Sequence, residues 1–253
     1  MPILDEFNLS NKVAIIAGDG AGSTPILAET LVEAGAKVFL IAESRTILNQ
    51  SLEGLVRQDD VAFGVVANPI HQIELENALT TLFSRWNKVD ILVNNFQSAH
   101  CKPFQDTTVM EWEETMAQTL RPVVFLCNNV GRRMIHQQHG RIVNIISGLA
   151  ERGLFNSSVS CATQGAILQL TRALSLECAT HDLRVNAIGT GWYTVEEDPR
   201  QEVRLDRLLR YIPNQRLGHP KDIAPLIVYL CSDACGYTTG QPIYVDGGLM
   251  AHP

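Results

Sequence analysis

A glycine-rich turn near the start of the chain has the composition of a phosphate-binding loop. It reads Gly18-Asp19-Gly-Ala-Gly22-Ser23-Thr24 and lies between an apolar stretch and a helical one. Such a turn presents backbone N–H groups and the positive end of a helix dipole to an anion. Gly18 would permit the turn and Gly22 would let the backbone approach a pyrophosphate, so these two, with Ser23 and Thr24, are candidate nucleotide-binding residues. A tight turn without a ligand is the alternative, and the carboxylate of Asp19 argues against a pyrophosphate.

The six cysteines do not show the spacing of a metal or redox site. They stand at positions 101, 127, 161, 178, 231 and 235, without a Cys-x-x-Cys pair and without a histidine pair at zinc spacing. Free thiols in a reducing cytoplasm are the expectation. Cys161 could be a nucleophile, but no base is spaced to activate it. No metal site is predicted.

Short β-branched runs alternate with longer helical stretches along the chain. Strands are predicted at Val13–Ala17, Val38–Ile41, Val61–Val66, Asp90–Asn94, Arg141–Ile146, Arg184–Ile188 and Ile243–Val245. Helices are predicted at Thr24–Ala34, Thr46–Arg57, Ile73–Trp86, Met110–His136, Ser158–Ala179 and Pro220–Cys231. Non-alternating strands separated by helices indicate a doubly wound parallel sheet covered on both faces, a three-layer αβα fold. Residues 1–253 are expected to form a single domain, whose ligands bind at the carboxyl ends of the strands. The segment 190–214 is expected to act as a lid.

The composition excludes several functional classes. The 253 residues carry 20 Lys and Arg against 27 Asp and Glu, a formal charge of −7, and 45% are apolar. These are the values of a globular chain, and an isoelectric point near 5.5 argues against nucleic-acid binding. The absence of an 18-residue apolar run argues against a membrane span. The N-terminus lacks the basic start of a signal peptide, so a cytoplasmic location is expected.

Taken together, four further motifs resemble those of the short-chain dehydrogenase/reductase family over the whole chain. The segment Asp90–Asn95 resembles the family's fourth strand, and Gly140–Ser147 resembles the fifth strand with its catalytic serine. Arg184–Ile188 resembles the sixth strand, and Gly240–Gly248 resembles the C-terminal signature. The resemblance implies a Rossmann-type fold and an NAD(P)-dependent oxidoreductase acting on a small molecule. It also implies a homodimer or homotetramer assembled through two long helices and the last strand.

The family's chemistry uses an Asn, a Ser, a Tyr and a Lys, and the resemblance implies that only the serine remains. Flanking residues place Ser147 at the Ser position, Ser160 at the Tyr position, Gln164 at the Lys position and Thr119 at the Asn position. A serine hydroxyl is far less acidic than a phenol, and Gln164 could bind ribose hydroxyls but supplies no positive charge. Losing a positioned general acid costs about 10²–10⁴ in rate, so standard hydride transfer is not expected.

The cofactor positions implied by the resemblance are also altered. Ala42 takes the place of the Asp that selects NAD, while Glu43 could bind a ribose diol and would repel a 2′-phosphate. Glu43 therefore favours NAD, whereas Arg45 favours NADP, and a solvated charge pair is the alternative. Asn68 takes the place of an Asp that contacts adenine, with similar hydrogen-bonding capacity.

The nicotinamide half of the site departs further from the family pattern. Asn95 is retained after the fourth strand, but Phe96 and Gln97 replace small residues and would crowd a ribose unless they turned outward. After the sixth strand, the residue that contacts the carboxamide falls at Val195, beside Thr194. The adenosine half is thus expected to be better preserved than the nicotinamide half.

Three functions remain open on the sequence alone. The first is a divergent oxidoreductase with a substitute acid, for which Tyr193, His100 and Cys101 are the candidates and an ordinary loop residue is the alternative for each. The second is a non-redox lyase, dehalogenase or isomerase that uses Ser147, with Ser147 and Ser160 holding an oxyanion. The third is a catalytically inactive binding or partner subunit.

Overall fold

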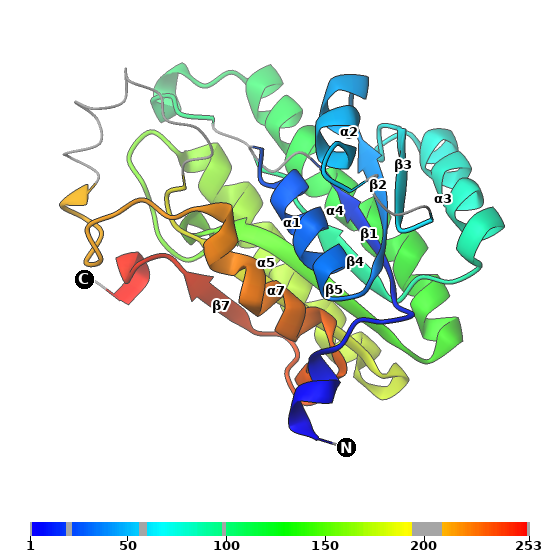
Figure 1. The fold of residues 1–253 in the computed structure, drawn as a ribbon. Helices are drawn as coiled ribbons and strands as arrows, with labels where there is room; N and C mark the ends of the chain where they lie inside the picture. The colour runs from blue at the N-terminus through cyan, green and yellow to red at the C-terminus, as the bar shows by residue number, and fades with distance from the viewer. Residues whose placement is uncertain (1, 19–21, 56–59, 98–99, 194–208, 252–253) are drawn as a thin grey trace.

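A single parallel sheet organises the chain. The computed structural model describes residues 2–18, 22–55, 60–97, 100–193 and 209–251. Within these residues, seven strands pair in the order β3-β2-β1-β4-β5-β6-β7, and every pairing is parallel (Figure 1). The order reverses between β1 and β4, where a doubly wound sheet opens a crevice at the carboxyl ends of its strands. The predicted fold class is confirmed.

The strands lie close to their predicted positions. They are β1 (Val13–Ala17), β2 (Lys37–Ala42), β3 (Ala62–Val66), β4 (Ile91–Asn94), β5 (Gly140–Ser147), β6 (Leu183–Thr190) and β7 (Pro242–Val245). All residues of β1 and β4 are buried, because helices cover both faces of the sheet. This burial explains why the central strands are continuous apolar runs in the sequence.

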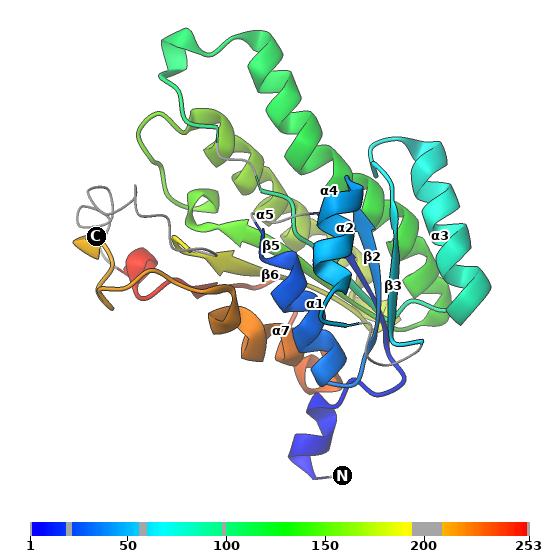
Figure 2. The same ribbon diagram turned by 45° about the horizontal axis from the view of Figure 1, so that its top comes forward.

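Two layers of helices cover the sheet, as Figure 2 shows. One core packs α1 (Thr24–Glu33), α2 (Arg45–Leu52) and α7 (Ala224–Cys231) against one face. The other core packs α3 (Gln72–Trp86), α4 (Val109–Gln137) and α5 (Ser158–Cys178) against the opposite face. The described residues also form short 3₁₀ helices near the chain ends and in the connections: η1 (Ile3–Phe7), η3 (Phe104–Asp106), η4 (Gly148–Ala150), η5 (Ala179–His181), η7 (Pro220–Ile223), η8 (Asp233–Cys235) and η9 (Leu249–Ala251).

The last predicted helix differs from the structure in a way that a proline explains. The predicted helix Pro220–Cys231 is divided into η7 and α7. Pro225 stands in the first turn of α7, where its missing N–H costs nothing, so it favours the start of an α-helix at this point. The second predicted helix, Thr46–Arg57, is also shorter in the structure, where it ends at Leu52.

A cluster of charges ties the elements together at the amino ends of the strands. Arg141, almost fully buried, donates to the Asp182 carbonyl at 2.8 Å and to the Ser232 carbonyl at 3.2 Å. His139 Nδ1 lies 3.0 Å from an Asp182 carboxylate oxygen, and Lys12 Nζ lies 3.2 Å from Asp233. Although burial alone would raise the pKa of Asp182, His139 and Arg141 lower it. We call Lys12, His139, Arg141, Asp182 and Asp233 the amino-end cluster. They connect the start of β5 and the segments that precede β1, β5 and β6 to η8.

A glycine inside α4 offers a stabilising substitution. Gly131 is buried, and a Cβ at that position would meet no described atom within 4 Å. Since glycine in a helix interior is less stable than alanine by about 0.5–1 kcal/mol, Gly131→Ala should stabilise the fold by that amount. Urea unfolding should show a raised midpoint with an unchanged slope. A lowered midpoint would contradict the open space beside this glycine.

Candidate functional site

The glycine turn leaves the carboxyl end of β1 in a conformation that needs glycine. Gly18 has φ +99° and Gly22 has φ +81°, both in the left-handed region. A Cβ on Gly18 would overlap the carbonyl oxygen of Asn95, so the turn also depends on close contact with the chain after β4. Thr24, at the start of α1, donates its hydroxyl to the Gly18 carbonyl at 2.8 Å. Asp19 lies outside the described residues.

Asn95 connects this turn to the end of β4. Its backbone N–H donates to the Ala17 carbonyl at 2.8 Å. Its side-chain Nδ2 donates to the hydroxyls of Ser23 at 3.0 Å and Thr24 at 2.9 Å. The Oδ1 atom is buried and has no hydrogen-bond partner among the described residues. The side chains predicted for nucleotide binding at β1 and β4 therefore form one connected group.

Phe96 is buried close to Gly18 of the glycine turn. Its side chain is 4% exposed and packs in the core shared with α3, α4 and α5. The sequence predicts that Phe96 crowds a ribose unless its side chain turns outward. In the structure the side chain is packed in the protein core. Gln97 is half-buried. Thr194 and Val195, which the resemblance placed near the nicotinamide, lie outside the described residues, as does most of the predicted lid.

The predicted adenosine contacts lie at the carboxyl ends of β2 and β3. Glu43 follows β2 and is exposed, and Ser44 caps α2 by accepting the Ile47 N–H at 3.3 Å. Asn68 follows β3 and its Oδ1 accepts the Ile70 N–H at 3.1 Å. Because β2 and β3 are neighbours in the sheet, Glu43 and Asn68 are on the same edge as the glycine turn.

Ser147 and Gln164 lie against each other. Ser147 ends β5, and its N–H donates to Oε1 of Gln164 on α5 at 2.9 Å. The Ser147 hydroxyl accepts the Leu149 N–H at 3.2 Å. The Gln164 side-chain oxygen is thus used to anchor α5 to the end of β5, and this side chain is 3% exposed.

The other two positions assigned from the family are also engaged within the chain. Ser160 is 2% exposed and donates its hydroxyl to the carbonyl oxygen of His100 at 2.9 Å. Thr119 is fully buried and donates its hydroxyl to the Thr115 carbonyl, one turn earlier in α4, at 2.6 Å. Among the described residues, no hydrogen bond joins Ser147 to Ser160 or to Thr119. The oxyanion site predicted for Ser147 and Ser160 stays a prediction, and in the structure the Ser160 hydroxyl donates to the chain itself.

A buried chain of polar side chains lies in the core beneath these positions. Asn94 Nδ2 donates to Oδ1 of Asn144 at 2.8 Å, and Asn144 Nδ2 donates to the Thr171 hydroxyl at 2.8 Å. All three residues are essentially without solvent exposure. They join β4, β5 and α5 and so fix the relative positions of Asn95, Ser147 and Gln164.

The candidate substitute acids differ in their surroundings, and the Tyr193 phenol is engaged with the backbone. The Tyr193 hydroxyl donates to the Val245 carbonyl at 2.6 Å, and burial raises the pKa of this phenol, as do the negative charges of Asp222 and Asp246. Cys101 is exposed, and Cys161, predicted as a weaker nucleophile candidate, donates toward the Arg152 carbonyl at 3.7 Å. His100 differs from these, since both of its ring nitrogens are buried without a partner among the described residues.

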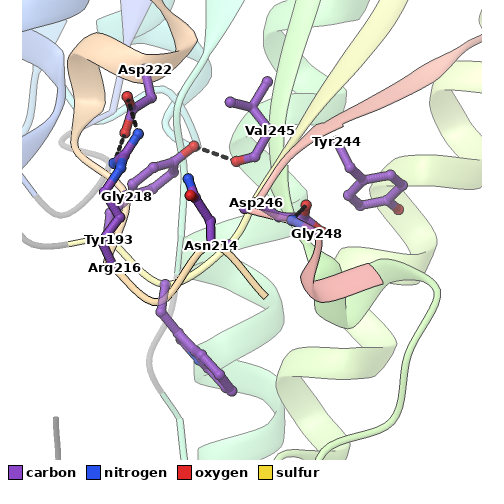
Figure 3. Close-up of a pocket in the computed structure, with 12 residues that line it drawn as sticks. Tyr193, Asn214, Arg216, Gly218, Asp222, Tyr244, Val245, Asp246 and Gly248 are labelled. Atoms are coloured by element: carbon purple, nitrogen blue, oxygen red, sulfur yellow. Dashed lines mark hydrogen bonds and ion pairs between the residues drawn. The ribbon is translucent and has the colours of Figure 1, made fainter. Parts of the chain in front are cut away.

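A polar cavity of about 350 Å³ lies beyond the carboxyl ends of β6 and β7 (Figure 3). Arg216 forms two hydrogen bonds with Asp222 at its rim, at 2.7 and 2.9 Å. Asp246 holds the C-terminal turn by accepting the N–H groups of Gly248 at 2.9 Å and Met250 at 2.7 Å. The wall includes Gly191, Tyr193 and Asn214 of the segment that the sequence predicted as a lid. It also includes the Asp246-Gly247-Gly248 signature.

The segment that carries His100 is held by an ion pair at the start of α4. Lys102 Nζ lies 2.7 Å from one Glu111 carboxylate oxygen and 3.0 Å from the other. The Lys102 ammonium, and then the N–H and hydroxyl of Thr108, lower the pKa of Glu111 to about 2 from an ordinary 4.5. The Lys102 N–H also donates to the Asn156 carbonyl at 2.7 Å, so the segment is tied to the turn before α5 as well.

This ion pair should give the segment a defined dependence on pH. A carboxyl group with a lowered folded-state pKa stabilises the fold above its unfolded value, and the contribution is lost as the pH falls toward the folded value. Residues 100–111 should therefore loosen as the pH falls from about 4.5 to about 2. Lys102→Met should shift the Glu111 carboxyl titration, followed by NMR, toward higher pH. Lys88→Met removes a different ion pair and should leave the Glu111 titration unchanged. A wild-type Glu111 carboxyl that titrates near 4.5 would contradict the ion pair with Lys102.

Comparison with known proteins gives a consistent result over the full chain. A family model described as enoyl-(acyl carrier protein) reductase matches residues 24–250. L-xylulose reductase of Bos taurus is 32% identical over 97% of this chain and 99% of its own length. The 3-oxoacyl-(acyl-carrier-protein) reductase FabG of Aquifex aeolicus is 29% identical over 97% of this chain and 100% of its own.

The chain belongs to the short-chain dehydrogenase/reductase family. A solved structure of a gluconate 5-dehydrogenase from Burkholderia cenocepacia, in complex with NADP and tartrate, superposes with a TM-score of 0.91. It is 26% identical, and the match covers 99% of each chain. The short-chain dehydrogenase/reductase relatives named here are all reductases or dehydrogenases, so the chain is a homologue of oxidoreductases. Among its described residues, no helix is long and apolar enough to cross a membrane, and no three His, Cys, Asp or Glu side chains gather as a metal site would require.

Proposed function

We propose that this short-chain dehydrogenase/reductase homologue binds NAD(P) and lacks the tyrosine–lysine route for proton transfer. The dinucleotide would lie across the carboxyl ends of the strands, with its pyrophosphate at the turn formed by Gly18, Gly22, Ser23 and Thr24. Glu43, Asn68 and Asn95 would contact its sugars and adenine. A small-molecule substrate would lie beyond it, near Ser147.

The fit of the dinucleotide is supported by the turn itself. Gly18 and Gly22 have the left-handed conformations of a glycine turn at the start of a helix, where backbone N–H groups and the helix dipole favour an anion. The buried Oδ1 of Asn95, which has no partner among the described residues, can accept a hydrogen bond from a bound group. A bound nicotinamide would supply hydride chemistry, while the residues of this chain decide whether a proton can accompany it.

The observation that carries the second half of the proposal is the engagement of Ser160 and Gln164. The Ser160 hydroxyl donates to a backbone carbonyl and the Gln164 amide oxygen accepts a backbone N–H, each at 2.9 Å. Neither residue type can act as a neutral-pH acid, because an aliphatic hydroxyl is far less acidic than a phenol and an amide carries no charge. Thr119 donates within its own helix. Proton transfer at the family positions therefore has no titratable group to carry it.

Calorimetric titration with NAD⁺, NADH, NADP⁺ and NADPH tests the proposal directly. We expect micromolar binding of at least one oxidised and reduced pair, with a Gln164→Ala variant binding within a few-fold of wild type. The absence of binding by all four nucleotides would overturn the proposal, and the family membership would then describe ancestry alone.

The choice between NAD and NADP should depend on Glu43. Its carboxylate would repel a 2′-phosphate, which favours NAD, whereas Arg45 would attract one. Glu43→Gln should tighten NADP⁺ binding by about fivefold, on the order of 1 kcal/mol for a surface charge, and leave NAD⁺ binding within twofold. Arg45→Gln should weaken NADP⁺ binding instead. Equal effects of Glu43→Gln on both nucleotides would place this carboxylate away from the ribose.

We further propose that the protein is cytoplasmic and forms a homodimer or homotetramer. Large apolar side chains are exposed on the two long helices, including Met110 (73%) on α4 and Leu176 (80%) on α5. Faces of this kind are commonly covered by a partner subunit. Light scattering of the purified chain gives the assembly state directly, and a monomer at micromolar concentration would contradict this part of the proposal.

A further inference from the structure

The two ring nitrogens of His100 are buried in a way that ordinary packing does not explain, although the residue as a whole is half-buried. Both imidazole nitrogens are inaccessible to solvent and have no hydrogen-bond partner among the described residues. A neutral imidazole has one donor and one acceptor, and leaving both unpaired in the protein costs free energy. Native structures keep such unpaired groups rarely, and a catalytic role is one of the recognised reasons.

The backbone of His100 lies beside the position where the family carries its tyrosine. The His100 carbonyl oxygen is the acceptor of the Ser160 hydroxyl, at 2.9 Å. A serine side chain is several Å shorter than the tyrosine that the family carries at this point of α5. Histidine is the residue type best suited to exchange a proton at physiological pH, and His100 is the histidine bonded to Ser160.

The segment also has the rigidity that a proton-transfer group requires. Two residues after His100, Lys102 is bonded both to the Asn156 carbonyl and to the Glu111 carboxylate. These contacts come from the turn before α5 and from the start of α4, so they hold the segment between the two helices. A catalytic group held from two sides loses little entropy when a substrate binds.

We propose that the imidazole of His100 exchanges the proton of the substrate oxygen in place of the missing tyrosine. This inference rests on the proposed binding of NAD(P), which would accept or supply the hydride. When a secondary alcohol is oxidised, the neutral imidazole takes the hydroxyl proton as the C–H hydride leaves and the carbonyl forms. Reduction of a ketone reverses this, and the imidazolium returns its proton to the oxygen.

The first test reads the imidazole itself and needs no turnover. The ring C–H signals of His100, assigned by their loss in His100→Gln, should titrate between pH 5 and 9. They should also shift when the nucleotide that binds best in calorimetry is added. His136, exposed on α4, supplies the matched control variant His136→Gln, whose lost signals should be insensitive to nucleotide. A His100 ring that does not titrate in this range cannot exchange protons, and the proposal would be overturned.

The second test uses single turnover with enzyme in excess over NADH or NADPH. The probes are 5-keto-D-gluconate and L-xylulose, named for a reductase of Escherichia coli and one of Bos taurus, together with simple ketones. We expect slow oxidation of the reduced nucleotide that falls at least 100-fold in His100→Gln and less than twofold in His136→Gln, with nucleotide affinity unchanged in both. Turnover that survives in His100→Gln, or none in wild type, would overturn the assignment of His100. Calorimetry decides nucleotide binding separately, so the two proposals can fail independently.

Discussion

Replacing Gly18 with alanine should weaken nucleotide binding by about 100-fold and destabilise the fold. A non-glycine residue forced into the left-handed region costs about 1–3 kcal/mol. At Gly18 the new Cβ would also overlap the Asn95 carbonyl oxygen, which is backbone and cannot rotate away. The turn must then shift, and its N–H groups would move with it. A loss of about 100-fold in affinity corresponds to ~2.7 kcal/mol.

The measurement pairs calorimetry with urea unfolding. Gly153→Ala is the matched control, because a Cβ at Gly153 meets no described atom within 4 Å and should leave both quantities unchanged. A Gly18→Ala variant that keeps wild-type affinity would show that the turn does not hold the pyrophosphate. A Gly18→Ala variant that loses stability but binds the nucleotide as wild type does would show that Gly18 has a structural role only.

The second large effect is expected at Asn144, in the polar chain beneath the site. Asn144→Ala removes the acceptor of Asn94 and the donor to Thr171 and leaves a cavity in a fully buried position. Thr171 keeps its own bond to the Ile167 carbonyl, but Asn94 Nδ2 retains only the Cys127 sulfur at 3.4 Å. An unpaired buried amide and a small cavity together should lower the free energy of unfolding by about 2–4 kcal/mol.

A double-mutant cycle separates the energy of the Asn94–Asn144 interaction from the cost of the cavity. Asn94→Ala and Asn144→Ala should together cost less than the sum of the two single changes, with a coupling of about 1 kcal/mol or more. Asn129→Ala, which removes a partly exposed bond to the Phe125 carbonyl, should cost much less than either. Strict additivity of the Asn94 and Asn144 variants would mean that the two amides do not stabilise each other.

The sheet and its helices could be predicted because their apolar periodicity decides which residues are buried. β1 and β4 are continuous apolar runs in the sequence and fully buried in the structure. The same pattern could not decide where Phe96 goes, since a phenylalanine beside a strand end can face the crevice or the core. In the structure it belongs to the buried core that includes side chains of α3 and α4.

The sequence could predict which residues lie at the candidate site but not the partners to which their side chains bond. The resemblance brought Ser147 and Gln164 to one place, but it could not show that a backbone N–H would occupy the Gln164 oxygen. The direction of the Tyr193 hydroxyl toward Val245 and the pairing of Arg216 with Asp222 depend on loops that follow no period. The unpaired ring of His100 likewise depends on loop packing, which no local pattern encodes.

The amino-end cluster bears on how this protein could change over evolution. Arg141, Asp182, Lys12 and Asp233 anchor the sheet at the end opposite to the crevice. These contacts are thus remote from the residues that would decide the chemistry, and replacing a side chain at the crevice leaves them intact. A lineage can then lose a tyrosine and a lysine at the crevice without losing a folded chain. Such an arrangement lets natural selection test new side chains at one end of the molecule while the other preserves its architecture.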